Sequence, residues 1–184
     1  MVSEIHHVAV SVTDLEKSIP FYRDGLGLRM TLDMRVGNET MPARLRVPPG
    51  TTGRAVYFQG PSRIGQLELI QWDVPAAPAQ WRPKRPGEPG VFSLSFQVGQ
   101  DEIHEVYDRL MGMGVDCYQP PAASVLDNYG EITMFMCEDP DQIMIEFVSL
   151  PTVEQVRAFR AAARENAGDS SQAQEYKPSI RSNG

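Results

Sequence analysis

The chain has 184 residues, of which 41% are hydrophobic and 22% are charged, as in an ordinary globular protein with its own core. Its formal net charge of −7 does not supply the basic surface that nucleic-acid binding requires, so we expect no nucleic-acid partner. No apolar run approaches the roughly 20 residues that span a bilayer, and the N-terminus lacks the basic and apolar regions of a secretory signal. We therefore expect a cytoplasmic protein with no membrane partner. Cys117 and Cys137 form no disulfide framework or zinc spacing, so we expect reduced, partly buried thiols.

The first part of the chain predicts one strand, one helix and further strands. A β-branched apolar run over residues 5–12 is typical of a strand, and Thr13 or Asp14 then offers a helix N-cap. Pro20 interrupts the helical spacing that follows, because proline has no N–H to donate, and it predicts a kink or a late helix start. Short apolar runs bounded by Gly or Pro predict the remaining strands of this part, at residues 28–35, 43–47, 54–58 and 66–72.

Residues 73–90 are rich in Pro, Ala and Gly, a composition that cannot hold a helix or a central strand, and they read as a linker. The pattern then restarts with a strand over 92–98 and a helix over 101–111 that ends at Gly112 or Gly114. Short apolar runs predict the later strands, at residues 115–118, 124–126, 131–137 and 142–148. The last two are expected to form a hairpin across Asp139-Pro140-Asp141.

The tail predicts one more helix followed by disorder. Thr152 and Gln155 have the spacing of a capping box, and Val156, Phe159 and Ala163 lie on one face of a short amphipathic helix. From Gly168 onward the composition is polar and poor in aromatic residues, so we expect a disordered tail.

The two parts of the chain are an internal repeat. Residues 7–14 align with residues 93–101, with one extra residue before the cap, and His7 falls on Ser93 at an offset of 93 − 7 = 86. The triplet Leu67-Glu68-Leu69 aligns with Ile145-Glu146-Phe147 at an offset of 146 − 68 = 78. Two copies of strand, helix and three strands therefore account for nearly all of residues 5–149.

Three motifs in order resemble one known family. They are I-x-H-V-A-V-x-V-x-D-L from Ile5, F-Y-R-D-x-L-G-L from Phe21, and D-P-D-x-x-x-I-E-F from Asp139. Together they resemble the vicinal oxygen chelate superfamily of glyoxalases, epimerases, ring-cleaving dioxygenases and bleomycin-resistance proteins. The resemblance implies an α+β fold in which two tandem βαβββ modules form a cupped, half-barrel mixed sheet around a divalent metal ion. It also allows a homodimer, because members pair their modules within one chain or across two.

The expected organisation follows from this resemblance. A vicinal oxygen chelate domain spans 1–150, with module 1 at about 4–73, a linker at 74–90 and module 2 at about 91–149. Residues 151–184 then form the C-terminal helix and the flexible tail.

His7, Glu68 and Glu146 match metal-ligand positions of the resembled family. A carboxylate within an apolar strand is costly unless it is paired, hydrogen-bonded or bound to a cation. Strand alternation places each glutamate on one face and its apolar neighbours on the other, and it places His6 opposite His7. The alternative interpretation is a hydrogen-bonded core histidine and two exposed strand glutamates. The occurrence of both glutamates at corresponding repeat positions favours the ligand interpretation.

Ser93 departs from the family, whose fourth ligand at this position is usually a histidine. A serine hydroxyl is a weak ligand at neutral pH. Either the metal has the three protein ligands His7, Glu68 and Glu146, with water or substrate completing the shell, or the site is weakened or lost. The cofactor is thus expected to be a divalent ion among Mn, Fe, Ni, Co, Zn and Mg, and one histidine with two carboxylates favours Mn, Mg or ferrous Fe over Zn.

The resemblance predicts a metal-dependent lyase or isomerase of the glyoxalase or epimerase type that acts on a small oxygenated organic substrate. The metal acts there as a Lewis acid while a carboxylate moves a proton, a catalytic role that we assign to Glu146, with Glu68 as the second candidate. The alternatives are a metal-free bleomycin-resistance-like protein that binds an apolar ligand, which Ser93 favours, and a ring-cleaving dioxygenase, which needs two histidines. Candidates for an apolar pocket wall, each of which could equally be core, are Phe58, Trp72, Phe92, Met134, Met136 and Met144.

Overall fold

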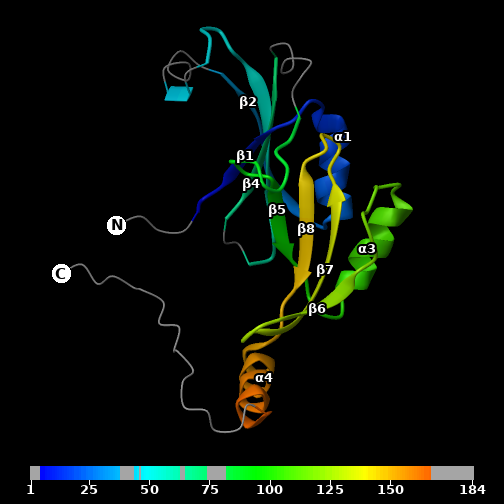
Figure 1. The fold of residues 1–184 in the computed structure, drawn as a ribbon. Coiled ribbons are helices and arrows are strands. Elements are labelled where there is room, and N and C mark those ends of the chain that lie inside the picture. The colour runs from blue at the N-terminus through cyan, green and yellow to red at the C-terminus, as the bar shows by residue number, and fades with distance from the viewer. Residues whose placement is uncertain (1–4, 38–43, 46, 63–64, 74–81, 167–184) are drawn as a thin grey trace, which may run out of the picture.

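Each half of the chain forms its own four-stranded sheet (Figure 1). The structure is a computed structural model that describes residues 5–37, 44–45, 47–62, 65–73 and 82–166. The first half contains β1 (Val8–Ser11), α1 (Leu15–Pro20), η1 (Phe21–Gly25), β2 (Arg29–Val36), β3 (Gly53–Gln59) and β4 (Leu67–Trp72). The second half contains β5 (Ser93–Gln97), α3 (Ile103–Gly112), β6 (Ala122–Leu126), β7 (Gly130–Glu138) and β8 (Met144–Ser149), and α4 (Val153–Asn166) follows it.

The two sheets have the same topology, in the orders β1-β4-β3-β2 and β5-β8-β7-β6. The first strand of each module runs parallel to the last one, and the other pairs are antiparallel. The register matches as well, because Ala9 pairs with Glu68 and Ser95 pairs with Glu146. Since Ala9 and Ser95 each lie two residues after His7 and Ser93, this pairing confirms the internal repeat and the α+β fold of two βαβββ modules.

The first helix changes its winding at Pro20. Asp14 is the N-cap, and its side chain accepts the N–H of Glu16 at 3.0 Å. Pro20 ends α1, and the chain continues as the π-helix η1, in which Leu26 N–H donates to the Phe21 carbonyl at 3.1 Å. The sequence thus predicts the position of the irregularity, which is a change to π-helical bonding rather than a late start.

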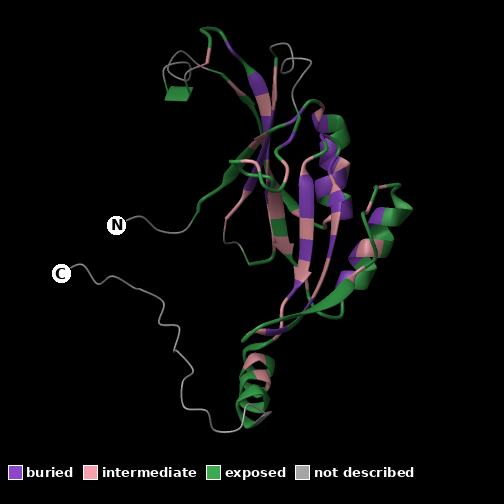
Figure 2. Ribbon diagram, viewed as in Figure 1, coloured by how far each residue is buried: buried purple, intermediate pink, exposed green. Residues whose placement is uncertain are grey.

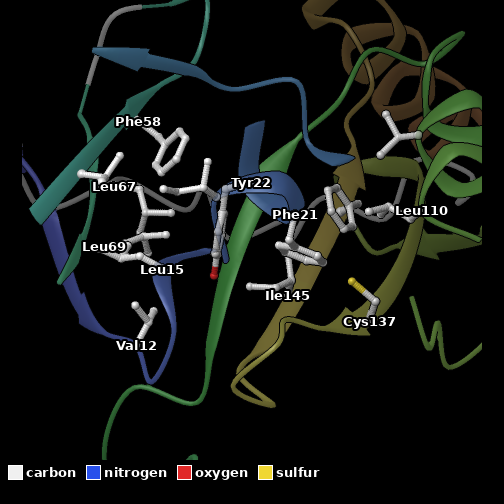
Figure 3. Close-up of a cluster of buried hydrophobic side chains, with 14 of the residues drawn as sticks. Val12, Leu15, Phe21, Tyr22, Phe58, Leu67, Leu69, Leu110, Cys137 and Ile145 are labelled. Atoms are coloured by element: carbon white, nitrogen blue, oxygen red, sulfur yellow. The ribbon is translucent and has the colours of Figure 1, made fainter. Parts of the chain in front are cut away.

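Both modules contribute to one hydrophobic core. The inward faces of β3, β4, β7 and β8 pack with α1, η1 and α3 in a single cluster. In Figure 3, Tyr22 and Phe21 lie between Phe58 and Leu67 of the first sheet and Ile145 of the second. η1 approaches α3 closely at Gly25, where an added Cβ would lie 2.8 Å from Leu110 Cδ2. The absence of a side chain at Gly25 therefore permits this helix contact.

Buried carboxylates of the Asp139-Pro140-Asp141 turn join the second module to the first. Tyr22 Oη donates to Asp139 at 2.7 Å, and Asp139 also accepts the N–H groups of Asp141 and Ile143 at 2.9 and 2.8 Å. Asp141 accepts the Thr13 hydroxyl at 2.5 Å and the Thr13 N–H at 3.1 Å. Burial raises the pKa of Asp139 and, together with the neighbouring Asp139 charge, that of Tyr22. The hairpin predicted here is confirmed, and its turn is an inter-module contact.

Two predicted strands differ from the structure. Arg44 and Leu45 lie in a helical turn and not in the predicted strand. The short polar-apolar alternation there is compatible with either geometry, so it does not distinguish them. Residues 115–118 form only an isolated bridge between Cys117 and Cys137. These two cysteines are free, half-buried and buried respectively, as expected, and burial raises the pKa of both thiols.

Where the structure describes them, the segments outside the modules agree with the predictions from the sequence. Residues 82–90 contain no helix or strand, as predicted for the linker. The capping box of α4 is confirmed, since Thr152 N–H donates to Gln155 Oε1 at 2.7 Å and Gln155 N–H donates to Thr152 Oγ at 3.2 Å. Most of α4 is exposed (Figure 2). The predicted disorder lies outside the described residues. None of the described helices is long and apolar enough to cross a membrane.

Replacing Tyr22 by Phe removes one of the three hydrogen bonds that the Asp139 carboxylate accepts. We expect Tyr22→Phe to lower the free energy of unfolding by about 1–3 kcal/mol, because Asp139 stays buried with one donor fewer. The matched control is Tyr107→Phe, because the Tyr107 ring packs on Phe135 at 5.4 Å between centroids and no hydrogen bond of its hydroxyl is found among the described residues. Urea denaturation measures both variants, and equal losses would contradict this role of Tyr22.

Candidate functional site

Glu68 faces away from the core of the first sheet. Its neighbours Leu67 and Leu69 belong to the hydrophobic cluster, so the alternation predicted from the sequence is confirmed. The Glu68 residue is nevertheless only 7% exposed. Its carboxylate accepts a hydrogen bond from Tyr57 Oη at 2.5 Å, from the adjacent strand β3, in which Tyr57 pairs directly with Glu68. The cost of burying this charge is thereby partly offset.

His7 lies beside Glu68, as the ligand hypothesis requires. The distance from His7 Nε2 to Glu68 Oε2 is 3.4 Å, and the His7 side chain is 39% exposed. His6 was expected on the opposite side, and that expectation is wrong: the two Nδ1 atoms lie 2.9 Å apart. Both histidines precede β1, which begins at Val8, so strand alternation does not govern their side chains.

Tyr57 is a member of this site that the sequence analysis missed. Burial, the hydrogen bond to Glu68 and the Glu68 charge raise the pKa of Tyr57 to about 12. The phenol therefore remains protonated at neutral pH and serves as a donor to the carboxylate. The Tyr57 ring also lies 6.1 Å from the His7 ring, edge to face. Only the register between β3 and β4 reveals this contact, and no local sequence signal specifies that register.

Glu146 occupies the equivalent place in the second sheet. Ile145 and Phe147 are buried in the core, and Glu146 points to the other face, where it is half-buried between its pairing partners Ser95 and Met136. No hydrogen bond or ion pair of its carboxylate is found within the described residues. Glu146 is therefore a carboxylate available to a ligand.

One chain brings two of the three predicted metal ligands together. His7 and Glu68 are adjacent, whereas across residues 5–37, 44–45, 47–62, 65–73 and 82–166 no three His, Cys, Asp or Glu side chains gather as a metal site. Glu146 lies on the other sheet, and Ser93 starts β5 opposite Met144. Among the described residues, His7 and Glu68 thus provide two of the roughly three protein ligands that a catalytic metal site uses.

The six candidates for a pocket wall divide between core and surface. Phe58 and Met144 are buried, and Phe58 belongs to the core cluster. Met134 and Met136 are half-buried on β7, while Trp72 Nε1 donates to Ser11 Oγ at 3.1 Å. Phe92 is 39% exposed and lines a cavity.

Comparisons with known proteins agree with this architecture. A model of the Glyoxalase/Bleomycin resistance protein/Dioxygenase superfamily matches residues 4–147. The lactoylglutathione lyase-like protein terB of Aspergillus terreus is 27% identical over 161 residues, which cover 83% of this chain and 78% of that protein.

Solved structures share the fold at low identity. A glyoxalase family protein from Bacillus cereus has a TM-score of 0.68 and 17% identity, over 83% of this chain and 97% of that one. The fosfomycin resistance protein FosX from Listeria monocytogenes has a TM-score of 0.55 and 15% identity, over 85% and 99%. With the family model matching far more than half of its length, the chain belongs to the Glyoxalase/Bleomycin resistance protein/Dioxygenase superfamily.

Proposed function

We propose that the protein is a metal-dependent lyase or isomerase of the glyoxalase type that acts on a small oxygenated organic substrate. We further propose that a second copy of the chain completes its metal site. The observation that carries this proposal is the pairing of His7 with Glu68 at 3.4 Å, on the face of the first sheet turned away from the core. An imidazole next to a buried carboxylate is a donor set that suits a divalent transition metal.

Glu146 of a second copy is the missing third donor. It has the same register position in its sheet as Glu68 has in the first. In a two-fold symmetric dimer, each site would then combine His7 and Glu68 of one protomer with Glu146 of the other, and the symmetry generates two equal sites. Members of the superfamily pair their modules within one chain or across two, so a site with two ligands from one chain and one from the other is consistent with the family.

Exposed apolar side chains support an interface on these faces. Leu32 of β2 pairs with Tyr57, which pairs with Glu68, so all three lie on one face. Leu32 is 47% exposed and Met34 is 42% exposed. In the second module every residue of β6 is exposed, and Leu126, which is 44% exposed, lies by register on the same face as Glu146. Contact between these two surfaces would bury apolar area that the single chain leaves in water.

The two glutamates suit different tasks. The Tyr57 hydroxyl fixes the Glu68 carboxylate, so Glu68 is suited to a constant ligand position. Glu146 has no such partner among the described residues, and it can take a proton from a substrate carbon and return it to the neighbouring carbon. A bound divalent ion would supply charge stabilisation for the substrate oxygens. Tyr57 stays protonated and keeps Glu68 oriented.

The runner-up is a metal-free binding protein of the bleomycin-resistance type. The observation that favours it is Ser93 in place of the fourth ligand, together with the lack, among the described residues, of any cluster of three His, Cys, Asp or Glu side chains that could hold a metal. Elemental analysis of protein purified without chelators separates the two functions, because only the enzyme retains metal. Oxygen consumption with catechols would instead indicate the ring-cleaving dioxygenase.

A complementation experiment tests the shared site. We expect His7→Gln and Glu146→Gln each to lose bound metal and activity, because each removes one of three ligands from both sites of a dimer. Mixing the two inactive variants after dissociation creates heterodimers in which one site is intact. With random pairing, metal content and turnover should recover to about one quarter of the wild-type value.

Three results would contradict the shared site. Metal retained by Glu146→Gln removes Glu146 from the ligand set, and a failure of the mixture to recover places all ligands in one chain. A wild-type protein without metal removes the enzymatic proposal and leaves the binding protein. The matched control is Glu131→Gln, an exposed glutamate on β7, which should keep both metal and activity.

The positioning role of Tyr57 can be measured separately. A double-mutant cycle of Tyr57→Phe and Glu68→Gln should give a coupling free energy of about 1–2 kcal/mol in urea denaturation, the range for a hydrogen bond to a charged group. If the two losses of stability simply add, the 2.5 Å contact does not stabilise the fold. In the enzyme, Tyr57→Phe should lower metal affinity by about tenfold, because a residue that hydrogen-bonds a metal ligand holds that ligand in the orientation for binding.

A further inference from the structure

A cavity lies between β1 and β5, the first strands of the two modules. β1 and β5 are edge strands of their sheets, so each has one side without a neighbouring strand in its own sheet. The cavity encloses about 660 Å³, a size typical of small-molecule sites. Its walls come from β1, the linker, the start of β5 and Ile143, while His7, Glu68 and Glu146 do not line it.

The body of this cavity is apolar. Val8 and Val10 of β1, Phe92 and Leu94 of the β5 segment, and Ile143 all line it. Phe92 is 39% exposed and Val91 is 75% exposed, so a ligand would reach aromatic and aliphatic surface that water now contacts. An apolar ligand body gains free energy in proportion to the area that it covers there.

Residues of the linker form the rim of the cavity, and their contacts fix them there. Pro83 is buried, and Arg85 Nη1 donates to Glu138 Oε1 at 2.8 Å, which ties the linker to the end of β7. The Arg85 N–H also donates to Glu88 at 2.9 Å. Lys84 lies between Pro83 and Arg85, so its backbone is fixed, and it is one of the residues that line the cavity.

The charge at the rim is positive. Arg82 and Lys84 are the charged residues among those that line this cavity, in a chain whose formal net charge is −7. Arg82 Nη1 pairs with Glu88 at 2.9 Å, which neutralises it. For Lys84, no ion pair is found over the described ranges. Lys84 is therefore a cationic residue in the lining of an apolar cavity that has no acidic lining residue, and the nearby acid Glu88, which interacts with its charge, is already paired with Arg82.

We propose that this cavity binds a small organic acid. The apolar body of the acid lies between β1 and β5, and its carboxylate or sulfonate group pairs with Lys84. A strongly hydrated lysine ammonium recognises an anion as a point charge, without the planar fork of arginine. This site goes beyond the proposed metal chemistry, because it requires neither His7 nor the glutamates.

Two dyes with the same ring system test the site. Anilinonaphthalene sulfonate has an apolar body and an anionic group, and N-phenylnaphthylamine has nearly the same body without the charge. Lys84→Gln should weaken sulfonate binding by about tenfold in a fluorescence titration, because it removes one charge-assisted contact, and should leave the neutral dye within about twofold. Phe92→Ala should weaken the binding of both dyes, because it removes part of the wall.

Lys17→Gln is the matched control, because Lys17 lies on α1, pairs with Asp14 at 3.6 Å and is not part of the cavity. Unchanged sulfonate affinity in Lys84→Gln, or an equal loss in Lys17→Gln, would overturn the proposal. Insensitivity of both dyes to Phe92→Ala would place the dye elsewhere and would also overturn it. His7→Gln should bind both dyes as the wild type does, so loss of the metal site and loss of this cavity are distinguishable.

Discussion

The buried turn between β7 and β8 is the contact on which the relation of the two modules depends. Asp139 and Asp141 are each 5% exposed, and they receive their donors from Tyr22 and Thr13 of the other module. A buried carboxylate with too few donors is costly, so the donors from the first module add stability to the two N–H bonds that Asp139 accepts within its own turn. The D-P-D motif thus joins the two modules.

The contact between the two modules also determines the direction in which the candidate site residues point. Both sheets direct their apolar faces, with Leu67 and Leu69 on one and Ile145 and Phe147 on the other, into one shared core. Because side chains alternate along a strand, Glu68 and Glu146 must both face away from that core. The same packing that stabilises the chain therefore turns both carboxylates away from the core. In the assembly that we propose, a second chain supplies the third ligand of the His7–Glu68 pair, and the core of each chain stays unchanged.

Periodicity and local chemistry predicted much of the fold, but not the contacts between strands. Alternation placed Glu68 and Glu146 correctly, the proline rule located the change in winding at Pro20, and the capping box located the start of α4. These signals involve neighbours in sequence. Tyr57 beside Glu68 depends on register, and the separation of Glu146 from His7 depends on how two sheets pack. His6 was placed wrongly because alternation was applied to residues that precede the strand. Such features arise from tertiary contacts that a short pattern does not contain.

Ser93 has a consequence for the symmetry of the proposed assembly. With histidine at both position 7 and position 93, each module would present the same donors. With serine there, the first module presents an imidazole and a carboxylate, and the second presents Glu146 alone. Two copies of the second module would bring only two glutamates together, which is fewer than three ligands. Two copies of the first module would bring two histidines and two glutamates, which is a site of different composition. Only contact between unlike modules gives the one-histidine, two-carboxylate set, and a two-fold dimer provides that contact twice without any change to the core of either chain.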